Sequence, residues 1–145
     1  MRNRTDVLLL VEDNPDDLAL ILRAFRLNGL IHPVVIARDG VEALDCLFGC
    51  EQQALPWLVV LDLKLPRLDG MGVLKAIRAN PRTRLIPVLL LTSSMLDDDL
   101  AACYTLGANS YLVKPIDFSR FLAMVASMTN YWLTLNQNAP TRVPA

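Results

Sequence analysis

The sequence contains one histidine, His32, and no glycine-rich loop of the kind that cradles nucleotide phosphates. His32 stands in a loop ahead of a predicted strand, where a solvated side chain is the ordinary expectation. These two absences exclude a histidine kinase and a histidine phosphotransfer protein.

Long hydrophobic runs are also absent, although 53% of the residues are apolar and the mean hydropathy is +0.35. No stretch approaches the roughly 18 apolar residues that a membrane-spanning helix needs. The first apolar run is followed at once by Glu12 and Asp13, without a small-residue cleavage site, which argues against a signal peptide. We therefore expect a cytoplasmic protein without a membrane span.

Neither charge nor cysteine is abundant. The 14 basic and 15 acidic residues give a formal net charge of −1, which lacks the basic excess typical of proteins that bind nucleic acids directly. The three cysteines are an odd number with no histidine beside them. This pattern favours reduced thiols over disulfides or a zinc site.

What the sequence does contain is a regular alternation of short apolar runs with segments of helical spacing. The runs predict strands at 7–11, 34–37, 58–61, 88–91 and 111–113. Ser94 and Asp97 have capping-box spacing ahead of the fourth helix, which Leu100, Cys103 and Tyr104 would stripe. The chain thus comprises five strand-helix units.

Such an alternation predicts an α/β fold, a doubly wound five-stranded parallel sheet with helices on both faces. The leading arrangement is the flavodoxin-like strand order 2-1-3-4-5, whose ligand site lies at the carboxyl ends of the strands. We expect one domain over residues 6–136, including an extended last helix from Phe118 to Leu135, and a flexible tail over 137–145.

The residues that follow the strands carry the chemistry. They are Glu12 and Asp13 after the first strand, Asp62 after the third, Thr92 after the fourth and Lys114 after the fifth. Three carboxylates in one pocket repel one another, and a hard divalent cation such as Mg²⁺ relieves this repulsion. A carboxylate can attack a phosphoryl donor to form an acyl phosphate.

Each of these residues has a simpler explanation when it is considered alone. Asp62 fits a turn or a helix cap, Thr92 fits a cap, and Lys114 fits a solvated charge. Only their joint position at one sheet edge favours Asp62 as a phosphoacceptor, with Thr92 and Lys114 as donors to the phosphoryl oxygens.

The sequence resembles the response-regulator receiver domains of two-component systems over about residues 6–130. The motifs that carry this resemblance are V-E-D-N at 11–14, L-D-L-K-L-P-R-L-D-G at 61–70, L-T-S-S at 91–94 and Y-L-V-K-P at 111–115. The resemblance implies that Asp62 is phosphorylated by a sensor histidine kinase. It also implies Mg²⁺ bound by Glu12, Asp13, Asp62 and the backbone carbonyl of Lys64.

By the same resemblance, Thr92 and Lys114 contact the phosphoryl group, and the peptide before Pro115 is cis. Movement of the Thr92 hydroxyl would turn the ring of Tyr111 inward and change the output face. Such a protein is a phosphoacceptor that assists its own phosphorylation and dephosphorylation, not an enzyme acting on a separate substrate. Lys64 and Ser94 are positions that influence how long the acyl phosphate survives. From the residues alone, Tyr111 is equally a half-buried strand residue.

The end of the last helix carries aromatic and apolar residues beyond those needed to cover the core of a domain of this size. Tyr131, Trp132 and Leu135 are candidates for a homodimer interface, although Trp132 alternatively folds back on the domain. This ending, together with V-E-D-N-P-D-D at 11–17 and I-P-V-L-L-L-T-S-S at 86–94, is similar to stand-alone regulators paired with bacterial and cyanobacterial phytochrome histidine kinases. A phytochrome-like kinase is therefore the expected partner.

Three competing functions remain to be weighed. A haloacid-dehalogenase-like hydrolase has a D-x-D pair, but the second position here is Lys64. A DNA-binding regulator would need an output domain after about residue 136, so we expect output through protein partners. The strongest alternative is a dimeric scaffold with a receiver fold that works without phosphorylation, against which Asp13, Asp62, Thr92 and Lys114 argue.

Overall fold

The computed structural model describes residues 7–49 and 54–140. Each apolar run forms a strand that is followed by a helix, as the alternation predicts. The elements are β1 (Leu8–Val11), α1 (Pro15–Leu27), β2 (Val34–Ala37), α2 (Gly40–Phe48), β3 (Leu58–Leu61), α3 (Gly70–Ala79), β4 (Val88–Thr92), α4 (Asp97–Thr105), β5 (Ser110–Val113) and α5 (Phe118–Asn130), which continues into a π-helical turn, Tyr131–Leu135.

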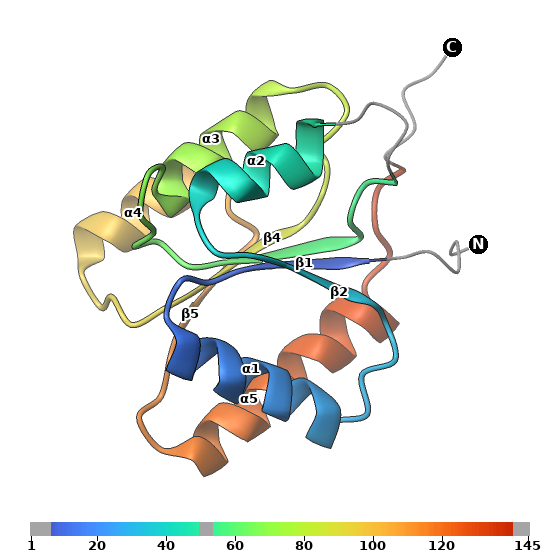
Figure 1. The fold of residues 1–145 in the computed structure, drawn as a ribbon, viewed down its shortest axis with the longest axis vertical. Coiled ribbons are helices and arrows are strands. Elements are labelled where there is room, and N and C mark those ends of the chain that lie inside the picture. Colours follow the sequence, from blue (N-terminus) through green and yellow to red (C-terminus); the bar gives the residue numbers. More distant parts are fainter. Residues whose placement is uncertain (1–6, 50–53, 141–145) are drawn as a thin grey trace.

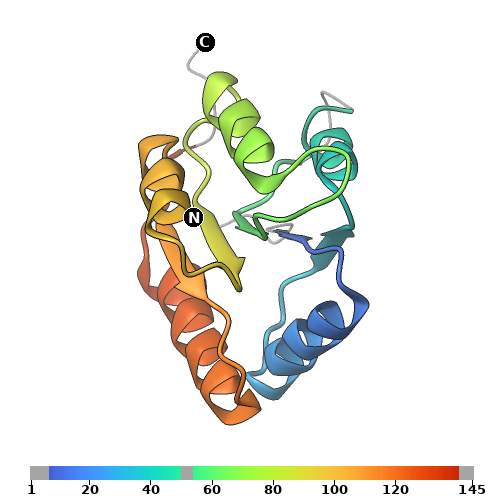
Figure 2. The same ribbon diagram turned by 90° about the vertical axis from the view of Figure 1, so that its left-hand side faces the viewer.

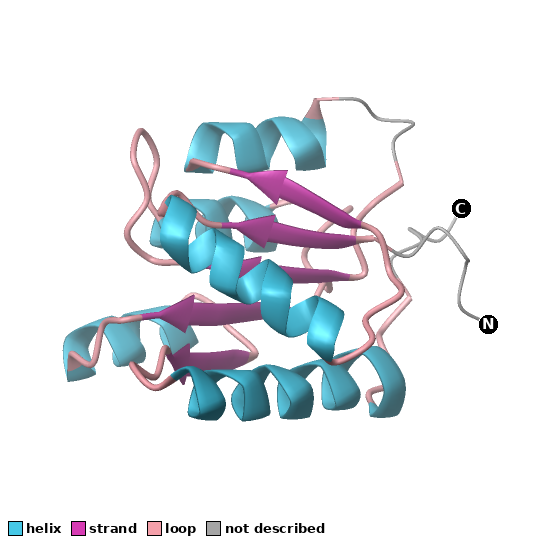
Figure 3. Cartoon of the chain, turned by 60° about the horizontal axis from the view of Figure 1, so that its bottom comes forward, coloured by secondary structure: helices cyan, strands magenta, loops and turns pink. Residues whose placement is uncertain are grey.

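The five strands form one parallel sheet in the order β2-β1-β3-β4-β5, which confirms the predicted topology. Figure 3 shows all five arrows pointing the same way. The three central strands, β1, β3 and β4, are buried along their whole length, whereas the edge strands β2 and β5 are only partly covered. Continuous apolar runs are what strands covered on both faces require.

Two layers of helices enclose the sheet. Helices α1 and α5 cover one face, and α2, α3 and α4 cover the other (Figure 1). Side chains alternate across the strands, so β1 contributes Leu8 and Leu10 to the core under α1 and α5, and Leu9 and Val11 to the core on the opposite side. The sheet therefore lies between two hydrophobic cores.

Side-chain caps begin most of the helices. Asn14, Asp39, Asp69 and Asp117 each accept hydrogen bonds from backbone N–H groups in the first turn of α1, α2, α3 and α5. The exception is α4, where the expected capping box is absent. Its N-cap residue is Leu96, and the Ser94 hydroxyl instead donates to Asp99 at 2.5 Å.

Helix α4 also buries fewer side chains than the sequence predicted. Cys103 is its buried residue, while Leu100 is 37% exposed and Tyr104 is 50% exposed. The helix begins with three aspartates and packs over edge strand β5, and Cys103 is the buried one of its nine residues. The predicted stripe was therefore wrong for Leu100 and Tyr104.

The end of the chain departs from a simple extended helix. After Asn130 the backbone widens into the π-helical turn, closed by the Asn136 N–H donating to the Tyr131 carbonyl at 2.6 Å. This turn buries Leu133 and leaves Leu135 60% exposed. The Asn138 side chain donates to the Trp57 carbonyl at 2.9 Å, so the start of the expected tail contacts the domain. The rest of that tail, 141–145, lies outside the described residues.

Among the residues that the structure describes, no helix is both long enough and apolar enough to cross a membrane.

Candidate functional site

The carboxyl ends of the strands meet at one edge of the sheet. Figure 2 looks onto this edge, with the helices around it. Two backbone hydrogen bonds fix the neighbouring strand ends: the Asp62 N–H donates to the Val11 carbonyl at 3.1 Å, and the Lys114 N–H donates to the Thr92 carbonyl at 2.8 Å. The strand ladder therefore places the predicted site residues side by side.

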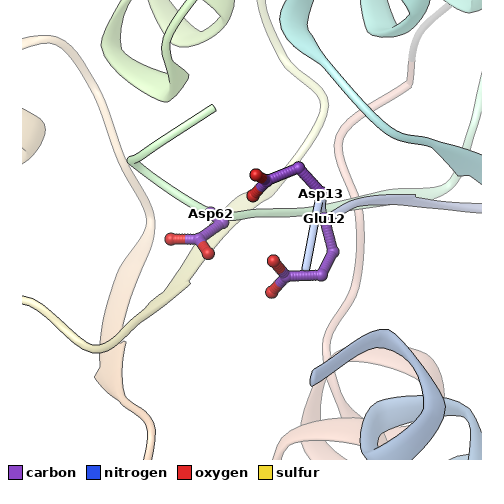
Figure 4. Close-up of side chains that lie close together, drawn as sticks. All are labelled: Glu12, Asp13 and Asp62. Atoms are coloured by element: carbon purple, nitrogen blue, oxygen red, sulfur yellow. The ribbon is translucent and has the colours of Figure 1, made fainter. Parts of the chain in front are cut away.

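Three carboxylates gather at this edge, as the sequence predicted. One oxygen from each of Glu12, Asp13 and Asp62 lies within 4.8 Å of the other two. Figure 4 shows the three side chains converging from the ends of β1 and β3. Glu12 and Asp62 are buried, and Asp13 is exposed. A donor set made only of carboxylate oxygens, open to solvent on one side, fits a hard divalent cation that keeps several waters.

Lys114 brings the positive charge to this cluster. Its ammonium Nζ donates to Glu12 Oε1 at 2.5 Å, to Asp17 Oδ2 at 2.9 Å and to Asp62 Oδ2 at 3.0 Å. The lysine side chain is only 8% exposed. A buried ammonium with three carboxylate partners offers a fixed, desolvated positive charge beside Asp62, which is what an incoming phosphoryl group requires.

Asp17 is the one member of this network that the sequence analysis did not place in the site. It stands in the first turn of α1, where an acidic residue is explained by the helix dipole alone. The available signal was the position of that turn, since α1 begins only four residues after the end of β1. A side chain there can reach the carboxyl edge of the sheet.

The electrostatics of the pair Glu12 and Lys114 follow from their burial. Burial raises the pKa of Glu12 to about 7; the hydrogen bond from Lys114 opposes this rise, and the charge of Asp62 adds to it. Burial lowers the pKa of Lys114, but the hydrogen bonds to Glu12 and Asp17 and the charge of Asp62 outweigh burial and raise it. Lys114 is therefore an ammonium at any ordinary pH.

The loop after β3 holds Asp62 in place. The Leu63 N–H donates to Asp62 Oδ1 at 2.7 Å, and the Gly70 N–H donates to the Leu63 carbonyl at 2.7 Å. Gly70 approaches so closely that a Cβ there would lie 2.2 Å from the Asp62 carbonyl oxygen. The side chain of Lys64 is exposed, and its backbone carbonyl as a metal ligand remains a prediction.

Thr92 and Tyr111 lie along a short chain of hydrogen bonds. The buried Thr92 hydroxyl accepts from the Ser94 N–H at 3.3 Å, and the Tyr111 hydroxyl donates to the Ser94 carbonyl at 3.0 Å. Tyr111 is only partly exposed, and its ring packs against the core on the side of α3 and α4. The aromatic residue and the hydroxyl thus contact the same loop from two sides.

Pro115 departs from the expectation. No cis peptide bond occurs among the described residues, so the Lys114–Pro115 bond is trans and the expectation of a cis bond was wrong for this structure. The trans form is the intrinsically preferred one, by about 0.5–1 kcal/mol for a bond before proline.

The three candidates for a dimer interface are placed differently from one another. Tyr131 is 48% exposed and Leu135 is 60% exposed. Trp132 is only partly exposed and packs against the core under α1 and α5, with its ring 5.0 Å from that of Tyr131 in an edge-to-face arrangement. Tyr131 and Leu135 therefore offer the freer surface, and Trp132 also contributes to the fold.

Comparison with known proteins agrees with this geometry. The chain is 43% identical to the probable methanogenesis regulatory protein FilR2 of Methanothrix harundinacea (strain 6Ac) over 91% of this chain and 86% of that protein. It is 37% identical to the response regulator Rcp1 of Synechocystis sp. (strain ATCC 27184 / PCC 6803 / Kazusa) over 90% of this chain and 91% of Rcp1.

Solved structures give the same result. The crystal structure of the phosphorylated cyanobacterial phytochrome response regulator RcpA matches with a TM-score of 0.87 and 35% identity, covering 93% of this chain and 99% of RcpA. The Mn²⁺-bound form of Rcp1 matches with a TM-score of 0.85 and 36% identity, over 93% and 99% of the two chains. The model of the response regulator receiver domain matches residues 8–126. The chain therefore belongs to the response regulator receiver domain family.

Proposed function

We propose that this receiver domain accepts a phosphoryl group from a sensor histidine kinase on Asp62 and passes the signal on by protein association. The observation that carries the proposal is the contact of Asp62 Oδ2 with the Lys114 ammonium at 3.0 Å, beside two further carboxylates. This contact supports the proposal because the Asp62 carboxylate, an ammonium and two more carboxylates lie within one small site.

The chemistry follows from these positions. A carboxylate oxygen of Asp62 attacks the phosphorus of the donor, a P–O bond to Asp62 forms, and the bond from phosphorus to the donor's leaving group breaks. Lys114 donates to a phosphoryl oxygen, and the Thr92 hydroxyl donates to another. Mg²⁺ held by Glu12, Asp13, Asp62 and the Lys64 carbonyl would supply charge neutralisation for the phosphoryl oxygens.

The same groups favour hydrolysis of the acyl phosphate, in which water attacks phosphorus, the bond from phosphorus to the Asp62 oxygen breaks and inorganic phosphate leaves. Because the acyl phosphate remains beside Lys114 and the cation ligands, the domain would assist its own dephosphorylation. Lys64 is exposed and Ser94 is partly buried at the rim of the site, where their side chains would affect the access of water to the phosphorus.

The output would run through Tyr111. When the Thr92 hydroxyl turns to the phosphoryl group it no longer accepts from the Ser94 N–H, and the loop that Tyr111 contacts can then shift. The surface next to this loop is apolar and exposed, with Met95 at 80% and Leu96 at 62%. Phosphorylation would thereby change which partners bind there.

The partners are inferred from the relatives. The similarity to RcpA and Rcp1 supports a phytochrome-like histidine kinase as donor. Exposed Tyr131 and Leu135 support a homodimer through the end of the last helix, and a cytoplasmic location suits such a pathway. A scaffold that works without phosphorylation is not favoured, because such a role does not need the hydrogen-bond network between Lys114 and the carboxylates around Asp62.

The test is the intact mass of the protein after incubation with acetyl phosphate, with and without Mg²⁺. We expect a phosphoryl adduct that requires Mg²⁺ and is absent from Asp62→Asn. The matched control is Asp98→Asn, an exposed aspartate in the first turn of α4, which should form the adduct normally. An adduct of equal size in Asp62→Asn would refute the proposal.

A further inference from the structure

Asp17 supplies the third carboxylate on Lys114 and comes from a helix rather than from a strand end. Its Oδ2 accepts from Nζ at 2.9 Å, while Glu12 and Asp62 accept from the same nitrogen at 2.5 and 3.0 Å. A lysine ammonium has three N–H donors, and all three are engaged with carboxylates here. Any new acceptor for Lys114 must therefore replace one of these three.

The three carboxylates differ in what they lose when Lys114 turns away. The Glu12 side chain is 1% exposed, so it would be left as a buried charge without its cation. The Asp62 side chain is 11% exposed and is itself the group that would carry the phosphoryl group. The Asp17 side chain is 37% exposed. It also lies in the first turn of α1, where the helix dipole stabilises a negative charge without help from Lys114.

Phosphorylation changes the balance of acceptors around Lys114. The reacting oxygen of Asp62 becomes part of an acyl phosphate and loses its full negative charge, while three charged phosphoryl oxygens appear beside the ammonium. These oxygens are stronger acceptors than a carboxylate that is partly in water. Of the two carboxylates that keep their charge, Glu12 and Asp17, Asp17 is the more exposed, so its contact with Lys114 costs less to give up.

We propose that Asp17 is a positioning residue that holds Lys114 in the unphosphorylated site and releases it to the phosphoryl group. This inference rests on the proposed role of Asp62 as phosphoacceptor. Asp17 acts through Lys114 and does not itself touch the reacting atoms. Because it binds Lys114 only in the unphosphorylated state, it opposes the phosphorylated state, and its removal should favour that state.

The first test measures an equilibrium with beryllium trifluoride, which occupies a carboxylate as a phosphoryl group does. Titration calorimetry at saturating Mg²⁺ compares the wild type with Asp17→Asn and Asp16→Asn. Asp16 is the matched control, because it lies in the same turn, carries the same charge and is exposed. Loss of a partly exposed ion pair should lower the apparent Kd of Asp17→Asn by about fivefold, with Asp16→Asn unchanged.

The second test observes Lys114 directly through the NMR signal of its Cε group. Asp17→Asn should shift this signal in the free protein, where the contact exists. With beryllium trifluoride bound, the wild type and Asp17→Asn should give the same signal, because the contact has been released in both. A difference that persists in the bound form would overturn the inference.

The outcomes separate this inference from the proposed function. If the wild type does not bind beryllium trifluoride, the role of Asp62 fails and the role of Asp17 fails with it. If the wild type binds, but Asp17→Asn binds no more tightly than Asp16→Asn, only the role of Asp17 is refuted.

Discussion

The Tyr111 hydroxyl donates a hydrogen bond to the backbone carbonyl of Ser94 at 3.0 Å, which ties β5 to the loop after β4. The same loop donates the Ser94 N–H to the Thr92 hydroxyl at 3.3 Å. A change at Thr92 can therefore reach Tyr111 through the backbone of one residue. This relationship links the candidate site to the surface at which partners would bind.

Tyr111→Phe should keep the fold and the phosphoryl adduct but loosen this loop. Loss of one partly buried hydrogen bond costs about 0.5–1.5 kcal/mol in the free energy of unfolding. Urea denaturation checks the stability, and intact mass checks the adduct. Tyr104→Phe, at a half-exposed tyrosine of α4, is the control and should leave both unchanged. Loss of the adduct in Tyr111→Phe would show that the hydroxyl serves chemistry, not signalling.

Gly70→Ala should damage the site through packing alone. The added Cβ would lie 2.2 Å from the Asp62 carbonyl oxygen and 2.8 Å from Leu63 Cα, both backbone atoms that cannot move without shifting the end of β3. We expect a loss of about 3 kcal/mol in the free energy of unfolding, from overpacking.

The control for that prediction is Gly72→Ala in the same helix. Its Cβ would meet Leu68 Cδ1, the end of a flexible side chain, at 2.5 Å. The gain in helix propensity, about 1 kcal/mol, should roughly offset this contact. Thermal unfolding of both variants decides the matter, and equal destabilisation of the two would contradict the close approach at Gly70.

The raised pKa of Glu12 predicts a pH dependence of stability without metal. Because burial raises its pKa from 4.5 to about 7, the folded protein binds more protons at Glu12 than the unfolded chain does between these values. This contribution to stability is complete below pH 4.5 and is lost as the pH rises through about 7.

Denaturation in the presence of a chelator, between pH 4.5 and pH 8, measures this effect. The stability of the wild type relative to Glu12→Gln should fall as the pH rises through about 7. A constant difference between the two proteins over this range would mean that folding does not raise the pKa of Glu12.

Leu135→Glu should weaken self-association without unfolding the domain. Leu135 is 60% exposed, so a charge there costs little in the monomer but would be buried without a partner in an interface. Light scattering measures the mass of the assembly. The control is Leu85→Glu, at a leucine that is 44% exposed and lies outside the last helix. Equal masses for Leu135→Glu and the wild type, both dimeric, would exclude this surface.

The sheet and most of the site were predictable from the sequence because they depend on local patterns. Continuous apolar runs identify buried strands, and the parallel order brings the residues after them to one edge. Glu12, Asp13, Asp62 and Lys114 are together in the structure for this reason. Their positions follow from the strand ends and the strand order, without knowledge of individual side-chain contacts.

The features that were missed depend on contacts between distant segments. Asp17 has an adequate local explanation in the helix dipole, and only its contact with Lys114, which follows β5, brings it into the site. Leu100 matches a buried stripe but lies on a helix at the sheet edge, where it stays 37% exposed. The π-helical turn that buries Leu133 likewise has no signal in the spacing of apolar residues.

The most direct test of the central claim is to locate the phosphoryl group. Borohydride reduces an acyl phosphate and marks the aspartate that carried it, so tandem mass spectrometry of the reduced, acetyl-phosphate-treated protein identifies that residue. We predict a single modified aspartate, Asp62, and its absence when Mg²⁺ is withheld. Modification at Asp13, at Asp17 or elsewhere, with Asp62 unmarked, would contradict the account.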